Sequence, residues 1–233
     1  MSRAFVIPDV HLKPWMFEKA DKLVAKGKFE DVVMLGDLVD DWGQGKNEDL
    51  YNETFDAAVA FVKKHPNTHW CYGNHDVSYL WGYEESGYSF IMRNTVVQRI
   101  RELEAVIGPG QAAFVHRIDD VCFSHGGIVD SLQRNFGDQE PNLDEMIRRI
   151  NIMDPEELWK DDSPLWARPD YWSMEPYANI RFQVVGHTPV RQPTLQGNLI
   201  ITDTFSTYWD GRPVGNEAFV WIDTMTFVAK EIT

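Results

Sequence analysis

Five short apolar runs in this chain are each followed at once by a turn that carries Asp, His or Asn. They are AFVI before PDVH, VVML before GD, HWCY before GNHD, VCF before SHGG and QVV before GHTP. Stretches with a helical spacing of apolar side chains, residues 14–27 and 47–65, separate the first three runs. Strand, helix and strand in succession imply parallel strands, whose carboxyl ends meet at one edge of a sheet. The pattern therefore predicts an α/β fold with these polar turns gathered at that edge.

The rest of the chain predicts further helices and strands in a looser order. Residues 92–107 and 141–152 have a helical spacing, and AAFVHRI with VCFSHGG predicts a hairpin that turns at Asp119 and Asp120. The stretches RFQVVGH, LIITDTF, EAFVWID and TFVAKEI predict strands. Residues 153–178 are rich in Pro, Trp, Asp and Tyr and predict a long ordered loop or lid. With no repeat or linker in the sequence, we expect residues 1–233 to form one domain.

Composition excludes some classes of partner. The formal net charge of −14 argues against non-specific binding to nucleic acid or to an anionic membrane, because both favour basic patches. No run approaches the roughly 18 apolar residues that span a bilayer, and AFVI is too short for the core of a signal peptide. Cys71 and Cys122 lie in apolar runs, so we expect buried, reduced thiols. The default expectation is a cytoplasmic protein.

The polar turns share one kind of chemistry. Their oxygen and nitrogen donors are Asp9, His11, Asp37, Asp40, Asn74, His75, His125 and His187. Carboxylate, amide and imidazole groups without thiolate are the ligands that Mn²⁺, Fe or Zn²⁺ use in hydrolytic sites, and a shared Asp can hold two ions close together. These residues therefore predict two divalent metal ions, with Mn²⁺ favoured.

This ordered set of motifs resembles that of the calcineurin-like metallophosphoesterase superfamily. The motifs are D-x-H, G-D-x-x-D, G-N-H-D, H and G-H-x, and they extend from residue 9 to residue 188. HGG and GHTP look most like the phosphoprotein phosphatase branch, which includes Ser/Thr protein phosphatases and dinucleoside tetraphosphatases. The resemblance implies an α/β fold in which two packed mixed β-sheets are flanked by helices.

The resemblance also implies a role for each matching residue. Asp9 and His11 would bind the first ion, Asn74, His125 and His187 the second, and Asp37 would bridge them. Pro189 replaces a second His that many members of the superfamily carry in the last motif. His75 resembles the general acid that protonates the leaving oxygen, and Asp40 is its expected partner. His65, His69 and His116 match no motif, so we interpret them as structural.

Two positions bear on how substrate phosphate is held. Members of this branch usually have V-D-R-G, whose arginine binds phosphate, but this chain has VDDW, which places Asp41 there. Asp41 is either a solvated or capping residue or a contact for a cationic or hydroxyl-bearing part of the substrate. Arg168 in SPLWARPDYW resembles the phosphate-binding arginine of bacterial relatives, and Asn74 is a second candidate for phosphate contact. Alternatively, Arg168 pairs with Asp162 or Asp170.

The favoured function is hydrolysis of a phosphomonoester in the manner of a Ser/Thr protein phosphatase. Aromatic residues in the lid-like segment, Trp159, Trp166, Tyr171, Trp172 and Tyr177, either pack on the core or stack on a nucleobase. Packing is the preferred interpretation, and stacking is the main support for the alternative, a hydrolase of nucleotides or dinucleoside polyphosphates. A non-catalytic metal-binding interaction module is a third hypothesis. The expected partner is a phosphorylated substrate, either a phosphoprotein or a nucleotide.

Overall fold

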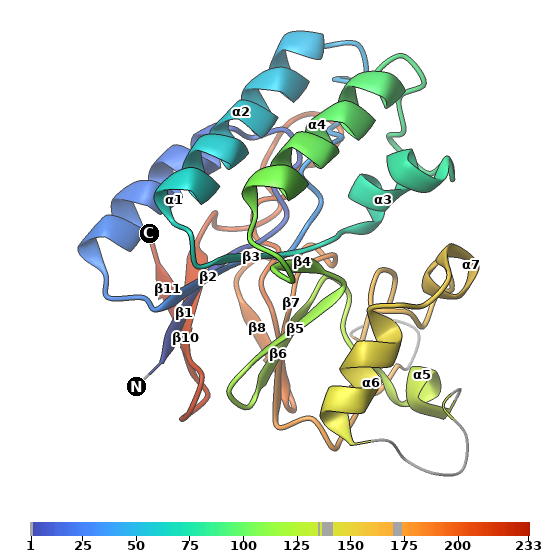
Figure 1. Cartoon of the computed structure of the whole chain (residues 1–233). Coiled ribbons are helices and arrows are strands. Elements are labelled where there is room, and N and C mark those ends of the chain that lie inside the picture. Colours follow the sequence, from blue (N-terminus) through green and yellow to red (C-terminus); the bar gives the residue numbers. More distant parts are fainter. Residues whose placement is uncertain (1, 135, 137–141, 170–173) are drawn as a thin grey trace.

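The computed structural model describes residues 2–134, 136, 142–169 and 174–233. Its first sheet has the strand order β11-β10-β1-β2-β3-β4. These strands are β1 (Arg3–Ile7), β2 (Asp31–Met34), β3 (Thr68–Cys71), β4 (Ala112–Ala113), β10 (Phe219–Asp223) and β11 (Val228–Ile232). The strands β1 to β4 run parallel, whereas β10 and β11 are antiparallel to their neighbours, so the sheet is mixed (Figure 1).

The second sheet has the order β5-β6-β7-β9-β8. Its strands are β5 (Val115–Ile118), β6 (Val121–Ser124), β7 (Phe182–Val185), β8 (Thr194–Gln196) and β9 (Leu199–Ile201). The strands β6, β7 and β9 are parallel, and β5 and β8 are antiparallel to their neighbours. Both sheets therefore present several parallel carboxyl ends.

The two sheets pack against each other through one set of alternating side chains. On β1, Ala4 and Val6 belong to the core between the sheets, together with Phe123 and Val184 of the second sheet. Phe5 and Ile7 point to the opposite face and pack against helices. This alternation follows from the two-residue period of a strand, and it places an apolar layer on both sides of each sheet.

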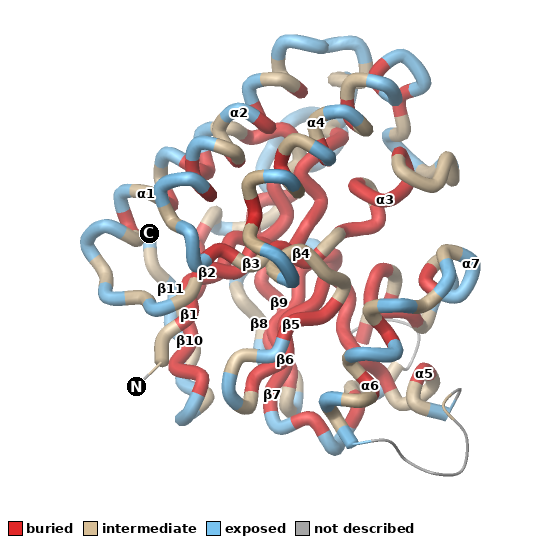
Figure 2. The backbone as a smooth tube through the Cα atoms, in the orientation of Figure 1, coloured by how far each residue is buried: buried red, intermediate tan, exposed pale blue. Residues whose placement is uncertain are grey.

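Helices cover the outer face of each sheet. The first sheet carries α1 (Trp15–Lys26), α2 (Glu48–Lys64) and α4 (Arg93–Val106), with α3 (Asn74–Trp81) next to them. The helices α5 (Asp130–Arg134), α6 (Leu143–Ile150) and α7 (Pro155–Leu158) lie on the side of the second sheet (Figure 1). Figure 2 shows that burial is concentrated in the strands and in the inner faces of the helices. The predicted arrangement, two packed mixed sheets flanked by helices, is thereby confirmed.

Several local predictions are confirmed and others are wrong. The helices predicted at 14–27, 47–65 and 92–107 are α1, α2 and α4, and the predicted hairpin is β5 with β6. The GNHD stretch was expected to be a loop, but Asn74 begins α3, because Gly73 and Asp76 cap a helix there. The predicted strand AAFVHRI divides into β4 and β5, and the short elements β8, α5 and α7 were not predicted. Cys71 and Cys122 are buried free thiols, as expected.

The segment 153–178 is only partly described, because residues 170–173 lie outside the described residues. It begins with α7, and Leu158, Leu165 and Ala167 are buried in the apolar cluster of the second sheet. Trp159 and Trp166 contact each other edge to face, with ring centroids 5.0 Å apart. Core packing is therefore the role of these two tryptophans. Among the described residues, no helix combines the length and apolarity that crossing a bilayer requires.

Candidate active site

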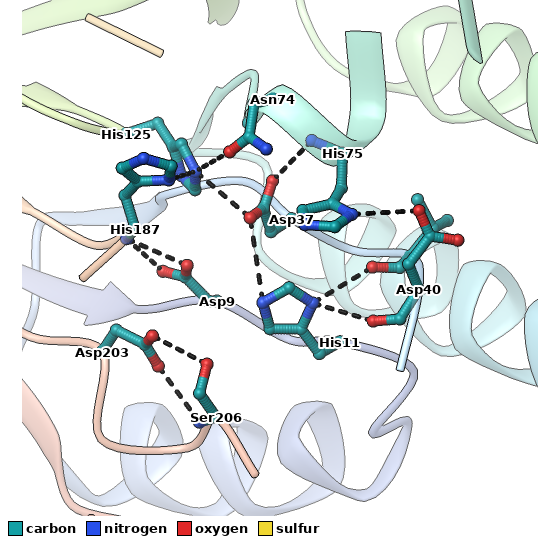
Figure 3. A network of polar contacts seen from close by, with 12 residues as sticks. Asp9, His11, Asp37, Asp40, Asn74, His75, His125, His187, Asp203 and Ser206 are labelled. Atoms are coloured by element: carbon teal, nitrogen blue, oxygen red, sulfur yellow. Dashed lines mark hydrogen bonds and ion pairs between the residues drawn. The ribbon is translucent and has the colours of Figure 1, made fainter. Parts of the chain in front are cut away.

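The predicted polar turns lie at the carboxyl ends of parallel strands from both sheets. Asp9 follows β1, Asp37 follows β2, His125 follows β6 and His187 follows β7, while Asn74 opens α3 directly after β3. Because the two sheets pack face to face, their carboxyl ends bring these side chains into one cluster (Figure 3). The spacing of the motifs predicted that these side chains lie at the edge of one sheet. In the structure, strands from two sheets contribute them.

Asp37 lies between two histidines. Its Oδ2 is 3.2 Å from His125 Nε2 and 3.8 Å from His11 Nε2 (Figure 3). His11 Nδ1 lies 2.8 Å from the carbonyl oxygen of Asp40, and His125 Nδ1 lies 2.7 Å from that of Leu35. A carbonyl oxygen only accepts, so each Nδ1 carries a proton, and Nε2 is the atom of each ring that can offer a lone pair to a cation. In the chain alone, burial works to lower the pKa of His125, but the carboxylates of Asp37 and Asp9 outweigh it and raise this pKa to about 9. One carboxylate oxygen between two such Nε2 atoms is the arrangement of a ligand shared by two cations.

The donor set around His125 provides an independent test of whether a cation fits. His125 Nε2 lies 2.9 Å from Asn74 Oδ1 and 3.0 Å from His187 Nδ1. The Asn74 amide oxygen, the Asp37 carboxylate and Nε2 of a neutral His125 ring are all acceptors, and they face one another. His187 Nε2 is also buried, with no hydrogen-bond partner among the residues that the structure describes. Converging acceptors of this kind are satisfied by a metal ion, and the oxygen and imidazole donors suit Mn²⁺, Fe or Zn²⁺.

Burial and close charged neighbours shift the pKa values of several residues in the cluster. Burial works to raise the pKa of Asp37, but the His125 and His75 imidazoles outweigh it and hold this pKa well below its usual range. For Asp9, burial and the neighbouring Asp203 raise the pKa well above the usual value. Burial and the nearby His125 lower the pKa of His187. Carboxylates and neutral imidazoles packed this closely favour a bound cation.

Asp9, which follows β1, contacts the backbone of His187, which follows β7 in the other sheet. Both of its oxygens accept the backbone N–H of His187, at 3.0 and 2.9 Å. A side chain at Gly186 would collide with the Asp9 carboxylate, just as one at Gly73 would collide with Asp37. Three clusters of close Asp, Glu or His donors occur in the described chain: His11, Asp37 and His75; Asp37, His125 and His187; and Asp40, His75 and Glu85. Asp9 adjoins these clusters with its carboxylate turned onto His187.

The backbone is strained at the site. His11, Asp37, Asp40 and His187 all have positive φ, at 43°, 48°, 65° and 61°. Residues other than glycine adopt this left-handed region at a cost of about 1–3 kcal/mol each, and they do so where surrounding contacts hold them. Four such residues in one cluster indicate that side-chain direction outweighs local backbone preference here.

His75 and Asp40 are in contact, as predicted. His75 Nδ1 lies 3.0 Å from Asp40 Oδ2 (Figure 3). The other oxygen of Asp40 accepts hydrogen bonds from Tyr51 at 2.7 Å and Tyr79 at 2.6 Å. Burial works to lower the pKa of His75, but the carboxylates of Asp37, Asp40 and Glu85 outweigh it and raise this pKa to about 10. His75 is therefore held protonated and is fixed in direction by a carboxylate that is itself fixed by two hydroxyls.

Glu85 is a site residue that the sequence analysis missed. Its Oε2 accepts a hydrogen bond from Asn74 Nδ2 at 2.6 Å, which turns the Asn74 oxygen toward His125. Its Oε1 lies 3.1 Å from His75 Nδ1, close enough for an ion pair but without the alignment of a hydrogen bond. Burial raises the pKa of Glu85 to about 7, although His75 opposes this shift. No motif surrounds YEES, so nothing in the sequence pointed to this residue.

Asp76 and Asp203 were missed as well. The Asp76 carboxylate accepts the backbone N–H groups of Asp37, Leu38 and Gly73, all at 2.9 Å, and so ties the second motif to the third. Asp203 follows β9 at the same edge and is fully buried. A polar turn after an apolar run is the signal used for the other motifs, and TD after LII would have identified Asp203.

A pocket of about 330 Å³ opens on the cluster. His11, Asp37, Asp40, His75 and His187 lie on its wall, and Arg168 and Asp41 line it too. Arg168 Nη1 donates to the carbonyl oxygen of His187 at 2.6 Å, so this guanidinium sits beside the donor cluster. Asp170, one of the alternative partners considered for Arg168, lies outside the described residues. The structure thus brings three of the predicted metal ligands, the His75–Asp40 pair and Arg168 around one cavity, and the other ligands, Asp9, Asn74 and His125, contact this group without being among the described residues that line the cavity.

Comparisons with known proteins agree with this geometry. The sequence family described as calcineurin-like phosphoesterase matches residues 2–191. A comparison with curated protein sequences gave no match.

Solved structures with a similar fold include three proteins of low sequence identity. One is a cold-active protein-tyrosine phosphatase of a psychrophile Shewanella sp., at 17% identity and a TM-score of 0.63, with 100% of this chain and 81% of that one covered. Another is a protein serine/threonine phosphatase from Saccharomyces cerevisiae with similarity to human phosphatase PP5, at 15% identity and a TM-score of 0.63, covering 99% and 79%. The third is a metallophosphoesterase from Sphaerobacter thermophilus, at 14% identity and a TM-score of 0.51, covering 100% and 88%.

At these identities the structural neighbours establish the fold, and the family match, which extends over most of the chain, establishes membership. The chain therefore belongs to the calcineurin-like phosphoesterase family and is a metal-dependent phosphoric ester hydrolase.

Proposed function

We propose that this chain is a phosphatase with two divalent metal ions, which hydrolyses phosphomonoesters in the manner of a Ser/Thr protein phosphatase. The observation that carries the proposal is the position of Asp37, whose Oδ2 faces the Nε2 atoms of His11 and His125 at 3.8 and 3.2 Å. Shared carboxylates of this kind hold the ion pairs of phosphatases. Mn²⁺ is the favoured ion, and Fe or Zn²⁺ suits the same donors.

The ligands divide between two positions on either side of Asp37. His11, with Asp9 nearby, would hold the first ion, and Asn74, His125 and His187 would hold the second. When bound, two divalent ions supply an activated water for attack on phosphorus and offset the charge of the phosphoryl oxygens.

The chain's own residues handle the leaving group. His75 lines the pocket and has its Nδ1 directed at Asp40, so its other ring nitrogen is left to give a proton to the departing oxygen. A raised pKa keeps that proton available near neutral pH. Asp40 accepts from two tyrosine hydroxyls, and this fixes the direction of the imidazole.

Arg168 is the proposed contact for a substrate phosphoryl oxygen. It lines the same pocket as His75 and Asp37. A guanidinium offers several donors in one plane, which suits a phosphoryl group, and the bond from Arg168 Nη1 to the His187 carbonyl holds the guanidinium beside the donor cluster. Asn74 Nδ2 is bound to Glu85, which supports metal ligation through its oxygen over phosphate contact.

The first experiment measures p-nitrophenyl phosphate hydrolysis by the purified chain before and after chelation, with Mn²⁺ added back. We expect activity to vanish with chelator and to return with Mn²⁺. Titration calorimetry should give two ions for the natural chain and fewer for His125→Asn. His65→Asn serves as a control, because His65 pairs with Asp21 and takes no part in the pocket lining.

The substrate class needs a second measurement. A panel of phosphopeptides is compared with diadenosine tetraphosphate at equal enzyme and metal concentration. A higher kcat/KM on phosphopeptides supports the proposal, whereas a higher kcat/KM on the dinucleotide supports a dinucleoside polyphosphate hydrolase instead. A metal-loaded protein without activity on any monoester contradicts the proposal.

A further inference from the structure

Part of the pocket wall is built from the loop after β2. Asp41, Trp42, Gly43 and Gly45 line the pocket there, and Thr207 lines it from a distant part of the chain. The glycines contribute no side chains, so the Trp42 indole is the largest group on this wall. Trp42 is 59% exposed.

The exposed indole is fixed in place. Trp42 Nε1 donates to the carbonyl oxygen of Thr207 at 2.9 Å. Asp41 Oδ1 accepts the Trp42 backbone N–H at 2.8 Å and the Thr207 hydroxyl at 2.9 Å. Asp41 Oδ2 lies 3.4 Å from the ammonium group of the buried Lys13. The polar edge of the ring is therefore used for anchoring, which leaves ring surface available to a ligand.

Charge around the pocket favours one phosphoryl group. Among the described residues that line it, Arg168 is the one Lys or Arg, whereas Asp37, Asp40 and Asp41 are acidic. A chain of several phosphates would need further cations along its path. The wall beyond the ion-binding cluster instead offers an aromatic face, which suits an uncharged planar group.

From these contacts we infer that Trp42 is a stacking platform for an aromatic group of the substrate, so that the preferred substrate is a phosphomonoester of an alcohol that bears an aromatic ring. Trp42 is two residues from Asp40, whose carboxylate contacts His75, and two residues span at most about 7 Å. Trp42 and His75 line the same pocket, so a ring bonded close to the ester oxygen enters the space that the indole borders. Asp41 acts here as a positioning residue that holds Trp42. The inference rests on the proposed phosphomonoesterase function.

The test compares benzyl phosphate with ethyl phosphate. Both release a primary alcohol, so they differ mainly in the ring. With the Mn²⁺-loaded full chain, we expect Trp42→Ala to lower the ratio of kcat/KM for benzyl over ethyl phosphate by roughly tenfold, the size expected for the loss of one stacked ring. Trp42→Phe should keep most of that ratio. Trp209→Ala is the matched control, because Trp209 is 79% exposed and is not part of the pocket lining.

Each outcome separates this inference from the proposed function. If the natural chain hydrolyses both esters and Trp42→Ala leaves the ratio unchanged, or lowers both rates equally, the stacking platform is refuted while the phosphomonoesterase stands. If Trp209→Ala lowers the ratio as much as Trp42→Ala, the effect is not specific to Trp42 and the inference fails. If the natural chain hydrolyses neither ester, the proposed function fails and the inference with it.

The source of the aromatic group is then found by comparing two further substrates, a phosphotyrosine peptide and a nucleoside 5′-monophosphate. The substrate whose kcat/KM falls in Trp42→Ala identifies the source of the aromatic group. A Trp42-independent rate on both would contradict the inference.

Discussion

Replacing Glu85 with Gln tests the link between the predicted ion-binding cluster and the predicted general acid. Glu85 accepts from Asn74 Nδ2 through one oxygen at 2.6 Å, and its other oxygen lies 3.1 Å from His75 Nδ1. A glutamine places one oxygen and one NH₂ group in these positions. Because both neighbours are donors, the glutamine can satisfy one of them and turns its own donor toward the other.

The size of the effect follows from the charge that is removed. Loss of a hydrogen bond or ion pair to a charged group costs about 1.5–3 kcal/mol, which corresponds to a fall of about 1–2 units in the pKa of His75. The surrounding carboxylates raise this pKa to about 10 against the opposing effect of burial. The acid form exists below the pKa, so a lower pKa moves the loss of that form to lower pH. Misdirection of the Asn74 oxygen should also weaken metal binding by roughly 10- to 100-fold.

The assay is the pH dependence of kcat on an alkyl phosphate at saturating Mn²⁺. An alkyl leaving group needs a proton, so the alkaline limb of this profile reports the general acid. Titration calorimetry of Mn²⁺ gives the second readout. Glu84→Gln is the matched control, because Glu84 is the exposed neighbour of Glu85 in the same loop.

Two results would refute the reasoning. If Glu85→Gln has the same alkaline limb as the natural chain and as Glu84→Gln, Glu85 does not sustain the charge of His75. If its affinity for Mn²⁺ is also unchanged, the bond to Asn74 does not direct a metal ligand.

Three further substitutions give independent checks. His75→Asn should lower kcat by roughly 10²- to 10⁴-fold while calorimetry shows unchanged metal binding, and equal turnover would remove His75 from the mechanism. Asp76→Ala removes the acceptor of three backbone N–H groups and should lower the free energy of unfolding in urea by about 3 kcal/mol or more, with Asp76→Asn less affected. Burial lowers the pKa of His116 to about 4. Stability from its neutral form is present above about pH 6.5 and is lost as the pH falls toward 4, so the chelated natural protein should lose about 2 kcal/mol more than His116→Gln between pH 7 and 4.5; equal losses would contradict this.

Local patterns in the sequence predicted the strands and their polar ends well. Continuous apolar runs give β1, β2 and β3, and parallel pairing places Asp9, Asp37 and Asn74 at the same edge. Contact between that edge and His125 or His187 depends on the packing of two sheets. The resemblance implied that packing, but the spacing of residues did not.

The contacts that the sequence could not predict are those made by isolated side chains across long separations. Glu85 reaches Asn74 and His75 from a loop without any motif, and Thr207 reaches Trp42 from 165 residues away. The start of α3 at Asn74 was missed because its cap depends on Asp76, whose carboxylate was read only as part of a motif. Such contacts arise from tertiary packing and leave no periodic signal.

The three aspartates of GDLVDD illustrate how the fold accommodates concentrated negative charge. Asp37 faces two imidazoles, and Asp40 accepts from two tyrosines and contacts His75. Asp41 has Lys13 and Thr207 as partners, which explains why a carboxylate is tolerated at the position where relatives carry arginine.

The same partners also hold a strained loop. Asp37 and Asp40 both have positive φ, and each such residue costs about 1–3 kcal/mol. The hydrogen bonds of their carboxylates offset this cost only while all partners are present, so these contacts depend on one another. The free energies of unfolding of variants at Asp40, Tyr51 and Tyr79 should therefore not add, since each substitution releases the same loop.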